Sequence, residues 1–173
     1  MNKAVFLDRD GVLNVAPIIG GVPSSPNRIE DLKIINEARR AVEILKSNGF
    51  IPVIVTNQPD IARGKVNIES VTKINNAICE ALAIEYLYMC SHDENDKCNC
   101  RKPEPGLILT ASADLSISLH DSFMVGDRWK DIAAGQAAGC KNFFIDYSYN
   151  EKQPFPPFTK VTSLYEATQL ICN

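Results

Sequence analysis

Five short apolar runs, separated by stretches with the periodicity of helices, constrain the fold of this chain more than any other feature. The runs cover residues 3–7, 51–55, 86–90, 122–125 and 142–146. Apolar residues recur every three or four positions over 35–48, 68–82, 105–115, 132–138 and 163–171. Strands that alternate with helices form βαβ units, which place parallel strands side by side with helices on both faces. We therefore expect an α/β fold with a mainly parallel sheet.

The length of the chain suits one domain. It has 173 residues, of which 45% are hydrophobic and 23% are charged, as is normal for a globular fold. Residues 15–33 are rich in Gly, Pro, Ser and Asn and predict a long loop, and such loops are often functional. The Pro-rich segment 151–160 is expected to be a surface loop. We predict a single domain over residues 1–173.

The charge of the chain and its lack of long apolar segments argue against several classes of protein. Its formal net charge is -3, whereas a protein that wraps a nucleic-acid backbone needs a dense basic face. No apolar run reaches the ~18 residues of a membrane-spanning helix. The apolar stretch Ala4–Leu7 is too short for a signal peptide. We expect a cytoplasmic protein, monomeric or weakly dimeric, that binds neither nucleic acid nor a membrane.

Three of the five predicted strands end in groups that can bind a metal ion or a phosphate. Asp8 and Asp10 follow the first strand, Thr56 and Asn57 end the second, and Asp127 follows the fourth. In such sheets ligands bind at the carboxyl ends of the strands. Asp8 and Asp10 point the same way if the extended backbone continues, and nearby carboxylates repel unless a cation lies between them. Three acids without a local histidine suit a hard cation such as Mg²⁺.

Lys102 follows a Cys-rich loop and could add a positive charge to this site. A divalent cation, a lysine and neutral donors around a carboxylate make a site for a phosphoryl group. The alternative is that the acids at 8 and 10 are solvated turn residues, Thr56 a strand-end hydroxyl and Lys102 a surface lysine.

Four motifs stand in an order that is typical of one family. They are FLDRDGVLN (6–14), VTNQ (55–58), the lysine of CRKPEPG (100–106) and VGDRWKDI (125–132). This pattern resembles the haloacid dehalogenase-like (HAD) phosphohydrolases. The resemblance implies a Rossmann-like parallel sheet, and the spacing between the motifs leaves no room for a separate cap domain.

The resemblance also implies roles for the site residues. Asp8 would be the nucleophile that forms an aspartyl-phosphate, and Asp10 would protonate the leaving oxygen and then activate water. Mg²⁺ would bind Asp8, Asp10 through its backbone carbonyl, and Asp127. Thr56 and Lys102 would hold the phosphoryl oxygens.

Further residues are predicted around this site. Asp131 would support the metal or orient Lys102, or it could simply be a helix N-terminal acid. Three arginines, Arg63, Arg101 and Arg128, are candidates for binding an anion, and Arg63 is the weakest of them. Each could also be a plain surface residue. The predicted substrate-binding residues are Asn57, Gln58, Arg101 and Arg128.

A cluster of cysteines precedes Lys102 and predicts a structural zinc site in the loop 90–100. Cys₃His is an accepted zinc set, and four protein ligands leave no open position on the metal. The zinc would fix Arg101 and Lys102 relative to the phosphate site. The alternative is a core cysteine at 90 beside a free or redox cluster. The predicted ligands are Cys90, His92, Cys98 and Cys100, whereas Cys79, Cys140 and Cys172 are expected to be small apolar residues.

The zinc loop narrows the resemblance to the branch of histidinol phosphatases and heptose-bisphosphate phosphatases. The stretches IARGK (61–65) and VGDRW (125–129) favour the heptose side. The stretch Ala16–Ile19 departs from it, because heptose bisphosphatases typically carry an acidic-His-Gly-Tyr segment there. The predicted substrate is a small sugar phosphate ester, first of all D-glycero-D-manno-heptose 1,7-bisphosphate. The alternatives are a histidinol-phosphate phosphatase and a catalytically silent, zinc-stabilised module that binds a phosphorylated metabolite.

Overall fold

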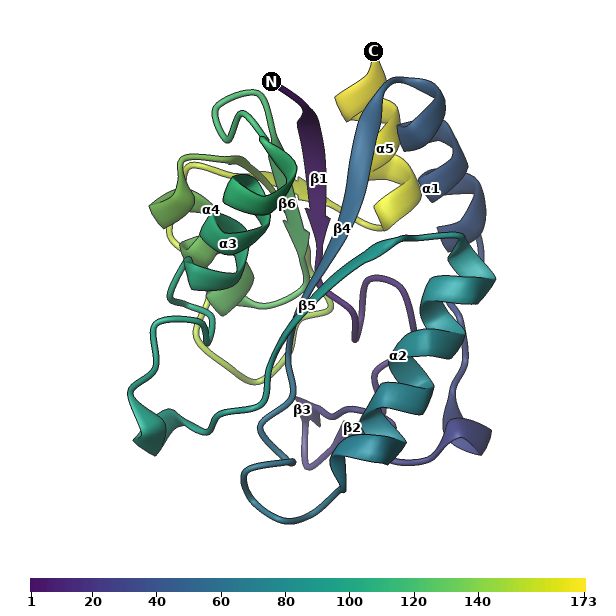
Figure 1. Ribbon diagram of the computed structural model, residues 1–173, viewed down its shortest axis with the longest axis vertical. Helices are drawn as coiled ribbons and strands as arrows, with labels where there is room; N and C mark the ends of the chain where they lie inside the picture. The colour runs from purple at the N-terminus through teal and green to yellow at the C-terminus, as the bar shows by residue number, and fades with distance from the viewer.

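A six-stranded sheet, in which every neighbouring pair of strands is parallel, forms the centre of the computed structural model, which describes residues 1–173 (Figure 1). The strand order is β5-β4-β1-β6-β7-β8. The strands are β1 (Lys3–Leu7), β4 (Phe50–Asn57), β5 (Tyr86–Cys90), β6 (Phe123–Gly126), β7 (Lys141–Ile145) and β8 (Thr159–Val161). The predicted α/β fold with a parallel sheet is confirmed.

Helices cover both faces of the sheet. On one face lie α1 (Ala38–Ser47), α2 (Ile68–Leu82) and α5 (Leu164–Cys172), and on the other lie α3 (Gly106–Leu115) and α4 (Trp129–Ala138) (Figure 1). Side chains alternate along a strand, so β1 contributes to two cores. Val5 and Leu7 pack in the core beneath the first group of helices, and Ala4 and Phe6 in the core beneath the second. None of the helices is both long and apolar enough to cross a bilayer.

Two segments that were predicted as loops contain short strands. Within 15–33, β2 (Ile18–Ile19) pairs antiparallel with β3 (Val22–Pro23) across Gly20 and Gly21, which have φ of 61° and 80°. Two consecutive residues with positive φ make a tight hairpin turn that favours glycine. Within 151–160, β8 begins at an edge position, where only its last residue, Val161, is buried. A strand with a single buried side chain has no apolar run to reveal it.

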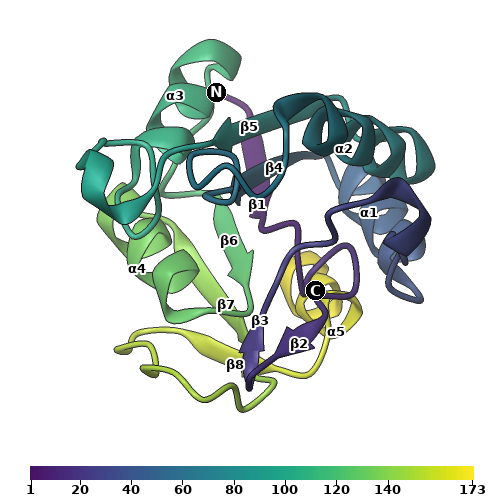
Figure 2. The ribbon, with the colours of Figure 1, turned by 90° about the horizontal axis from the view of Figure 1, so that it is seen from below.

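The strand order gathers the polar strand ends at one place. β1 lies between β4 and β6, so their carboxyl ends meet at the same edge of the sheet. The hairpin β2–β3, the loop after β4 and the loop after β5 surround this edge in the view of Figure 2. The loop after β5 includes the short 3₁₀ helix η2 (Glu94–Asp96), and a second one, η1 (Ile29–Asp31), precedes α1. No separate cap domain covers the edge, as the motif spacing predicted.

Candidate active site

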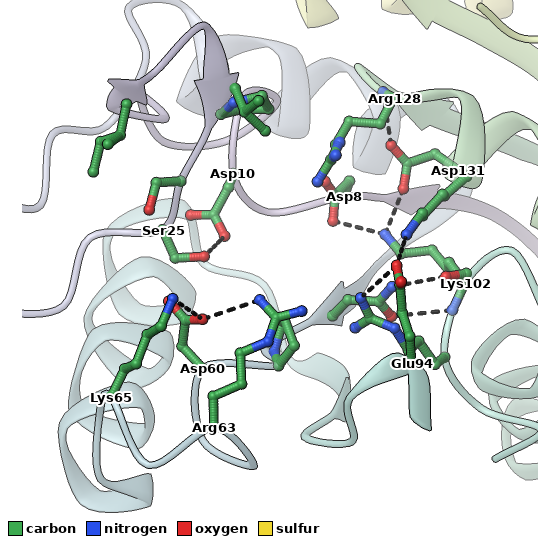
Figure 3. Close-up of a pocket in the computed structure, with 18 residues that line it drawn as sticks. Asp8, Asp10, Ser25, Asp60, Arg63, Lys65, Glu94, Lys102, Arg128 and Asp131 are labelled. Carbon is green, nitrogen blue, oxygen red and sulfur yellow. Dashed lines mark hydrogen bonds and ion pairs between the residues drawn. The ribbon is translucent and has the colours of Figure 1, made fainter. Parts of the chain in front are cut away.

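Lys102 is buried at the centre of this edge between two carboxylates. Its Nζ donates to Asp8 Oδ1 at 2.7 Å and lies 2.6 Å from Asp131 Oδ1 (Figure 3). It also donates to the Val55 carbonyl at 2.8 Å. Burial opposes the charge of the amine, but Asp131 and Asp8 outweigh burial and raise the pKa of Lys102 above its usual value. The lysine is therefore a fixed cation beside Asp8.

Three acids lie together beside this lysine. One oxygen from each of Asp8, Asp127 and Asp131 lies within 4.8 Å of the others. Burial and then the neighbouring Asp131 raise the pKa of Asp8 to about 7, and burial and then Asp8 raise the pKa of Asp127 well above its usual value. Carboxylates this close and this buried favour the ionised form only when a cation shares the site.

The surroundings of Asp127 test whether a metal ion fits. Asp127 Oδ2 accepts a hydrogen bond from the Tyr149 hydroxyl at 2.8 Å, whereas Oδ1 is buried and accepts none. A buried carboxylate oxygen without a partner is costly unless something binds it. The carboxylates of Asp8 and Asp131 lie beside that of Asp127, and the three form a donor set that suits a hard divalent cation. These residues therefore fit Mg²⁺.

Gly11 makes room for this arrangement. Its φ is +86°, and a Cβ built on it would lie 2.0 Å from Asp127 Oδ2. Any side chain at position 11 would displace the acid and would also strain the backbone. The glycine of the first motif is thus required by the close approach of the fourth.

Asp10 lines the same pocket as Asp8, but its carboxylate, which was expected to share a cation with Asp8 and Asp127, lies outside the three-acid cluster. It accepts hydrogen bonds from Asn14, Ser25 and Gln58 and forms a salt bridge with Arg9 at 2.9 Å. β1 ends at Leu7, so the chain is already turning at Asp10. Asp131 therefore takes the place in the cluster that the side chain of Asp10 does not fill. Metal binding by the Asp10 backbone carbonyl stays a prediction.

Thr56 and Asn57, which end β4, and Gln58, which follows it, bond chiefly within the protein. The Asn57 amide donates to the Lys102 carbonyl at 3.0 Å and accepts from the Lys102 backbone N–H at 3.1 Å. The Gln58 amide donates to both Asp10 and Thr56. Asn57 and Gln58, predicted to bind substrate, thus use these groups to position Lys102 and Asp10. Thr56 is buried at the strand end beside them.

The pocket over this edge has a volume of about 380 Å³ and is lined by several cations. Arg63 pairs with Asp93 at 2.6 Å, and Lys130 pairs with Glu94. The lining cations besides Lys102 are Arg63, Lys65, Arg101, Arg128 and Lys130. Five acids line the same pocket, namely Asp8, Asp10, Asp60, Glu94 and Asp131. The cations therefore lie among carboxylates, and they suit an anionic ligand that can exchange with these partners.

The two predicted anion-binding arginines both line the pocket, but each is partly engaged. Arg101 donates to the His92 carbonyl at 3.2 Å, which ties it to the cysteine loop. Arg128 donates through Nε and Nη2 to Glu151, and its backbone N–H donates to Asp131. Direct contact of Arg101 and Arg128 with substrate stays a prediction.

The four predicted zinc ligands lie together at the end of β5. Sγ of Cys100 is 3.2 Å from Sγ of Cys90 and 3.5 Å from Sγ of Cys98, and His92 Nδ1 is 3.4 Å from Sγ of Cys100. Tetrahedral zinc with ~2.3 Å bonds to sulfur places its ligand atoms roughly 3.5–3.8 Å apart. The set is compatible with zinc, and all six cysteines are free of disulfides.

Several residues at this edge were not singled out from the sequence. Lys130 and Glu94 lie in a helix turn and a polar loop, where charged residues are ordinary. Arg9 is fully buried and donates to Asn75 as well as to Asp10. Its position between two acids in the first motif is instead typical of an exposed turn residue. Tyr149 comes from a segment with no recognisable pattern.

Known proteins are similar to this chain in sequence. A family model described as HAD-hydrolase-like matches residues 99–158. The D-glycero-beta-D-manno-heptose-1,7-bisphosphate 7-phosphatases of Pasteurella multocida and Helicobacter pylori are each 37% identical to it, over 153 and 147 residues. Both matches cover 82% of this chain, and they cover 80% and 82% of the two relatives.

Solved structures share the fold. A crystal structure of D,D-heptose 1,7-bisphosphate phosphatase from B. bronchiseptica, complexed with magnesium and phosphate, is similar with a TM-score of 0.85 and 24% identity. That similarity covers 98% of this chain and 97% of the other. The corresponding phosphatase from Burkholderia thailandensis gives a TM-score of 0.67 at 20% identity, with 97% of each chain covered.

Proposed function

This chain belongs to the HAD-like phosphatase family, and from that membership we propose that it removes one phosphate from a sugar bisphosphate of the heptose 1,7-bisphosphate class. The membership is what the four ordered motifs predicted, and the chain is a phosphoric monoester hydrolase. The observation that carries the proposal is the buried group of Asp8, Lys102, Asp127 and Asp131 at the floor of a cation-lined pocket.

The distribution of charge in the pocket supports a bisphosphate as the substrate. Lys102 lies at the floor beside Asp8, where the reacting phosphoryl group would bind. Arg63, Lys65 and Lys130 line the same pocket. Each of them pairs with a carboxylate, so a second phosphate would bind by exchanging one anionic partner for another.

The proposed reaction proceeds in two steps on Asp8. Lys102 holds Asp8 Oδ1, which leaves Oδ2 to attack phosphorus. As the bond from phosphorus to the sugar oxygen breaks, Asp10 gives that oxygen a proton. Asp10 then takes a proton from water, the water oxygen attacks phosphorus, and the bond to Asp8 breaks to release inorganic phosphate. Lys102 and Thr56 neutralise or donate to the phosphoryl oxygens in both steps.

Mg²⁺ would be held by Asp8, Asp127 and the backbone carbonyl of Asp10, with Asp131 beside them. When bound, the ion neutralises charge on the acids and on the phosphoryl oxygens. The unpaired Oδ1 of Asp127 supports this assignment. Because Lys102 also pairs with Asp131, Asp131 would position the lysine.

Zinc in the Cys90–His92–Cys98–Cys100 set would be structural. Four protein ligands fill a tetrahedral zinc, so no position is left for substrate. The loop between these ligands has no buried residue in η2, and it bears Asp93 and Glu94, the partners of two pocket cations. The metal would stabilise a loop that has almost no apolar side chains of its own.

A substrate panel tests the proposal. The purified protein is assayed with Mg²⁺ on heptose bisphosphate, hexose phosphates and histidinol phosphate, and we expect the highest kcat/KM on the heptose bisphosphate. A higher kcat/KM on histidinol phosphate would assign the other branch of the family. Asp8→Asn is the matched control, because it keeps the shape of the side chain and should lower kcat by several orders of magnitude. Equal turnover by the two proteins would remove Asp8 as nucleophile.

A further inference from the structure

The segment between β7 and β8 belongs to none of the four motifs, yet it contacts residues of the proposed metal site. The Tyr149 hydroxyl donates to Asp127 Oδ2 at 2.8 Å, and the Tyr147 hydroxyl donates to the Gly11 carbonyl at 3.0 Å. The two rings lie 5.5 Å apart. Glu151 of the same segment forms a salt bridge with Arg128, the residue after Asp127. One segment therefore contacts the first and the fourth motif at once.

The hydroxyl of Tyr149 leaves Asp127 little freedom. Oδ2 is held by Tyr149 and lies against the Cα of Gly11, where even a methyl group would not fit. The opposite oxygen, Oδ1, is buried and free of hydrogen bonds. One oxygen of the Asp127 carboxylate is thus held by Tyr149, and the other has no partner, in a carboxylate that lies beside Asp8 and Asp131.

The Tyr149 hydroxyl has a single hydrogen to donate, and it donates this hydrogen to Oδ2 of Asp127.

We propose that Tyr149 is a positioning residue for the divalent cation: it holds Asp127 Oδ2 and thereby fixes the carboxylate with Oδ1 free to bind the ion. This inference rests on the metal site of the proposed function. Groups that orient a metal-binding carboxylate typically change metal affinity ~10–100-fold when they are removed. The tyrosine does not touch the substrate, so its effect should appear in metal binding first.

The test is direct titration of Mg²⁺ into the full chain with its zinc, by calorimetry and without substrate. Tyr149→Phe removes only the hydroxyl and should raise the Kd for Mg²⁺ about tenfold. Tyr147→Phe is the matched control, because it removes the same group two residues away, where the partner is a carbonyl. Its Kd should stay within about twofold of the wild type.

A second readout separates positioning from loss of stability. The rise in Tm on adding a fixed concentration of Mg²⁺ reports the affinity. This rise should shrink for Tyr149→Phe and not for Tyr147→Phe, even where both variants melt at the same temperature without the metal.

Each other outcome counts against the inference. An unchanged Kd in Tyr149→Phe, with normal binding by the wild type, would overturn the role of Tyr149 and leave the proposed function standing. Equal weakening by both variants would assign the effect to the whole segment and overturn the specific role of the hydroxyl. Absence of Mg²⁺ binding by the wild type would overturn the metal site and this inference together.

Discussion

The protein without Mg²⁺ but with its zinc, called metal-free below, should lose stability as the pH rises from 6 to 8. Burial raises the pKa of Asp8 from 3.8 to about 7, so folding favours the protonated acid. Between these two values the folded state binds a proton that the unfolded state releases, and each pH unit therefore lowers the free energy of unfolding by about 1.4 kcal/mol. As the pH passes through 7 the folded state also releases this proton, and the loss levels off by about pH 8.

The size of the effect follows from that window. From pH 6 to pH 8, a range that spans the folded-state pKa near 7, Asp8 alone accounts for a loss of about 1.4 kcal/mol. Asp127 shifts in the same direction and adds to it. Saturating Mg²⁺ should abolish the loss, because the cation keeps these acids ionised. The stabilisation by Mg²⁺ should therefore be larger at pH 8 than at pH 6, by the same amount.

Urea unfolding at pH 6, 7 and 8, with and without Mg²⁺, measures these free energies. The zinc must stay in place, so no chelator is added. Asp8→Asn is the control, because it removes the titrating acid and keeps every histidine and surface charge. Its metal-free stability should fall less than that of the wild type over the same range. A metal-free wild type whose stability is constant or rises from pH 6 to pH 8 would refute the reasoning.

Three further perturbations test other parts of the site. Gly11→Ala should fold with a cost of at least about 1–2 kcal/mol and bind Mg²⁺ more weakly, because its Cβ displaces Asp127; unchanged calorimetric affinity would contradict this. Zinc removal should increase hydrogen exchange over 90–102 and lower activity, and metal analysis should find one zinc per chain; exchange that does not respond to zinc would remove its structural role. Glu94→Gln should free Lys130 from its ion pair, and inorganic phosphate should then inhibit the enzyme a few-fold more strongly at low salt. Weaker inhibition by phosphate would contradict this expectation.

The core of the site could be predicted because its residues follow recognisable strands. Asp8, Thr56 and Asp127 each come directly after or at the end of an apolar run, and parallel strands end at a common edge. Lys102 has no such strand before it, and its place depended on the order of the motifs. The structure brings Lys102 within 2.7 Å of Asp8, although 94 residues separate them in the chain.

What could not be predicted depends on contacts that leave no local pattern. β8 has one buried residue, and the hairpin β2–β3 has none. The pairing of Asp10 with Arg9 requires a buried guanidinium, which nothing in the composition of the first motif indicates. Tyr149 reaches Asp127 only because β7 lies next to β6, and strand order is a property of the whole sheet.

The Asn57 side chain hydrogen-bonds with both the backbone N–H and the backbone carbonyl of Lys102, and these bonds attach the lysine to β4. The predicted zinc would secure the same stretch from its other end, at Cys100. Lys102 would thus be held both by Asn57 and by the zinc at Cys100. The turn at 93–97 could therefore change its length or its charges without moving the Lys102 amine. The residues of this turn, which would help to select the ligand, could then differ among relatives while Lys102 keeps its position beside Asp8.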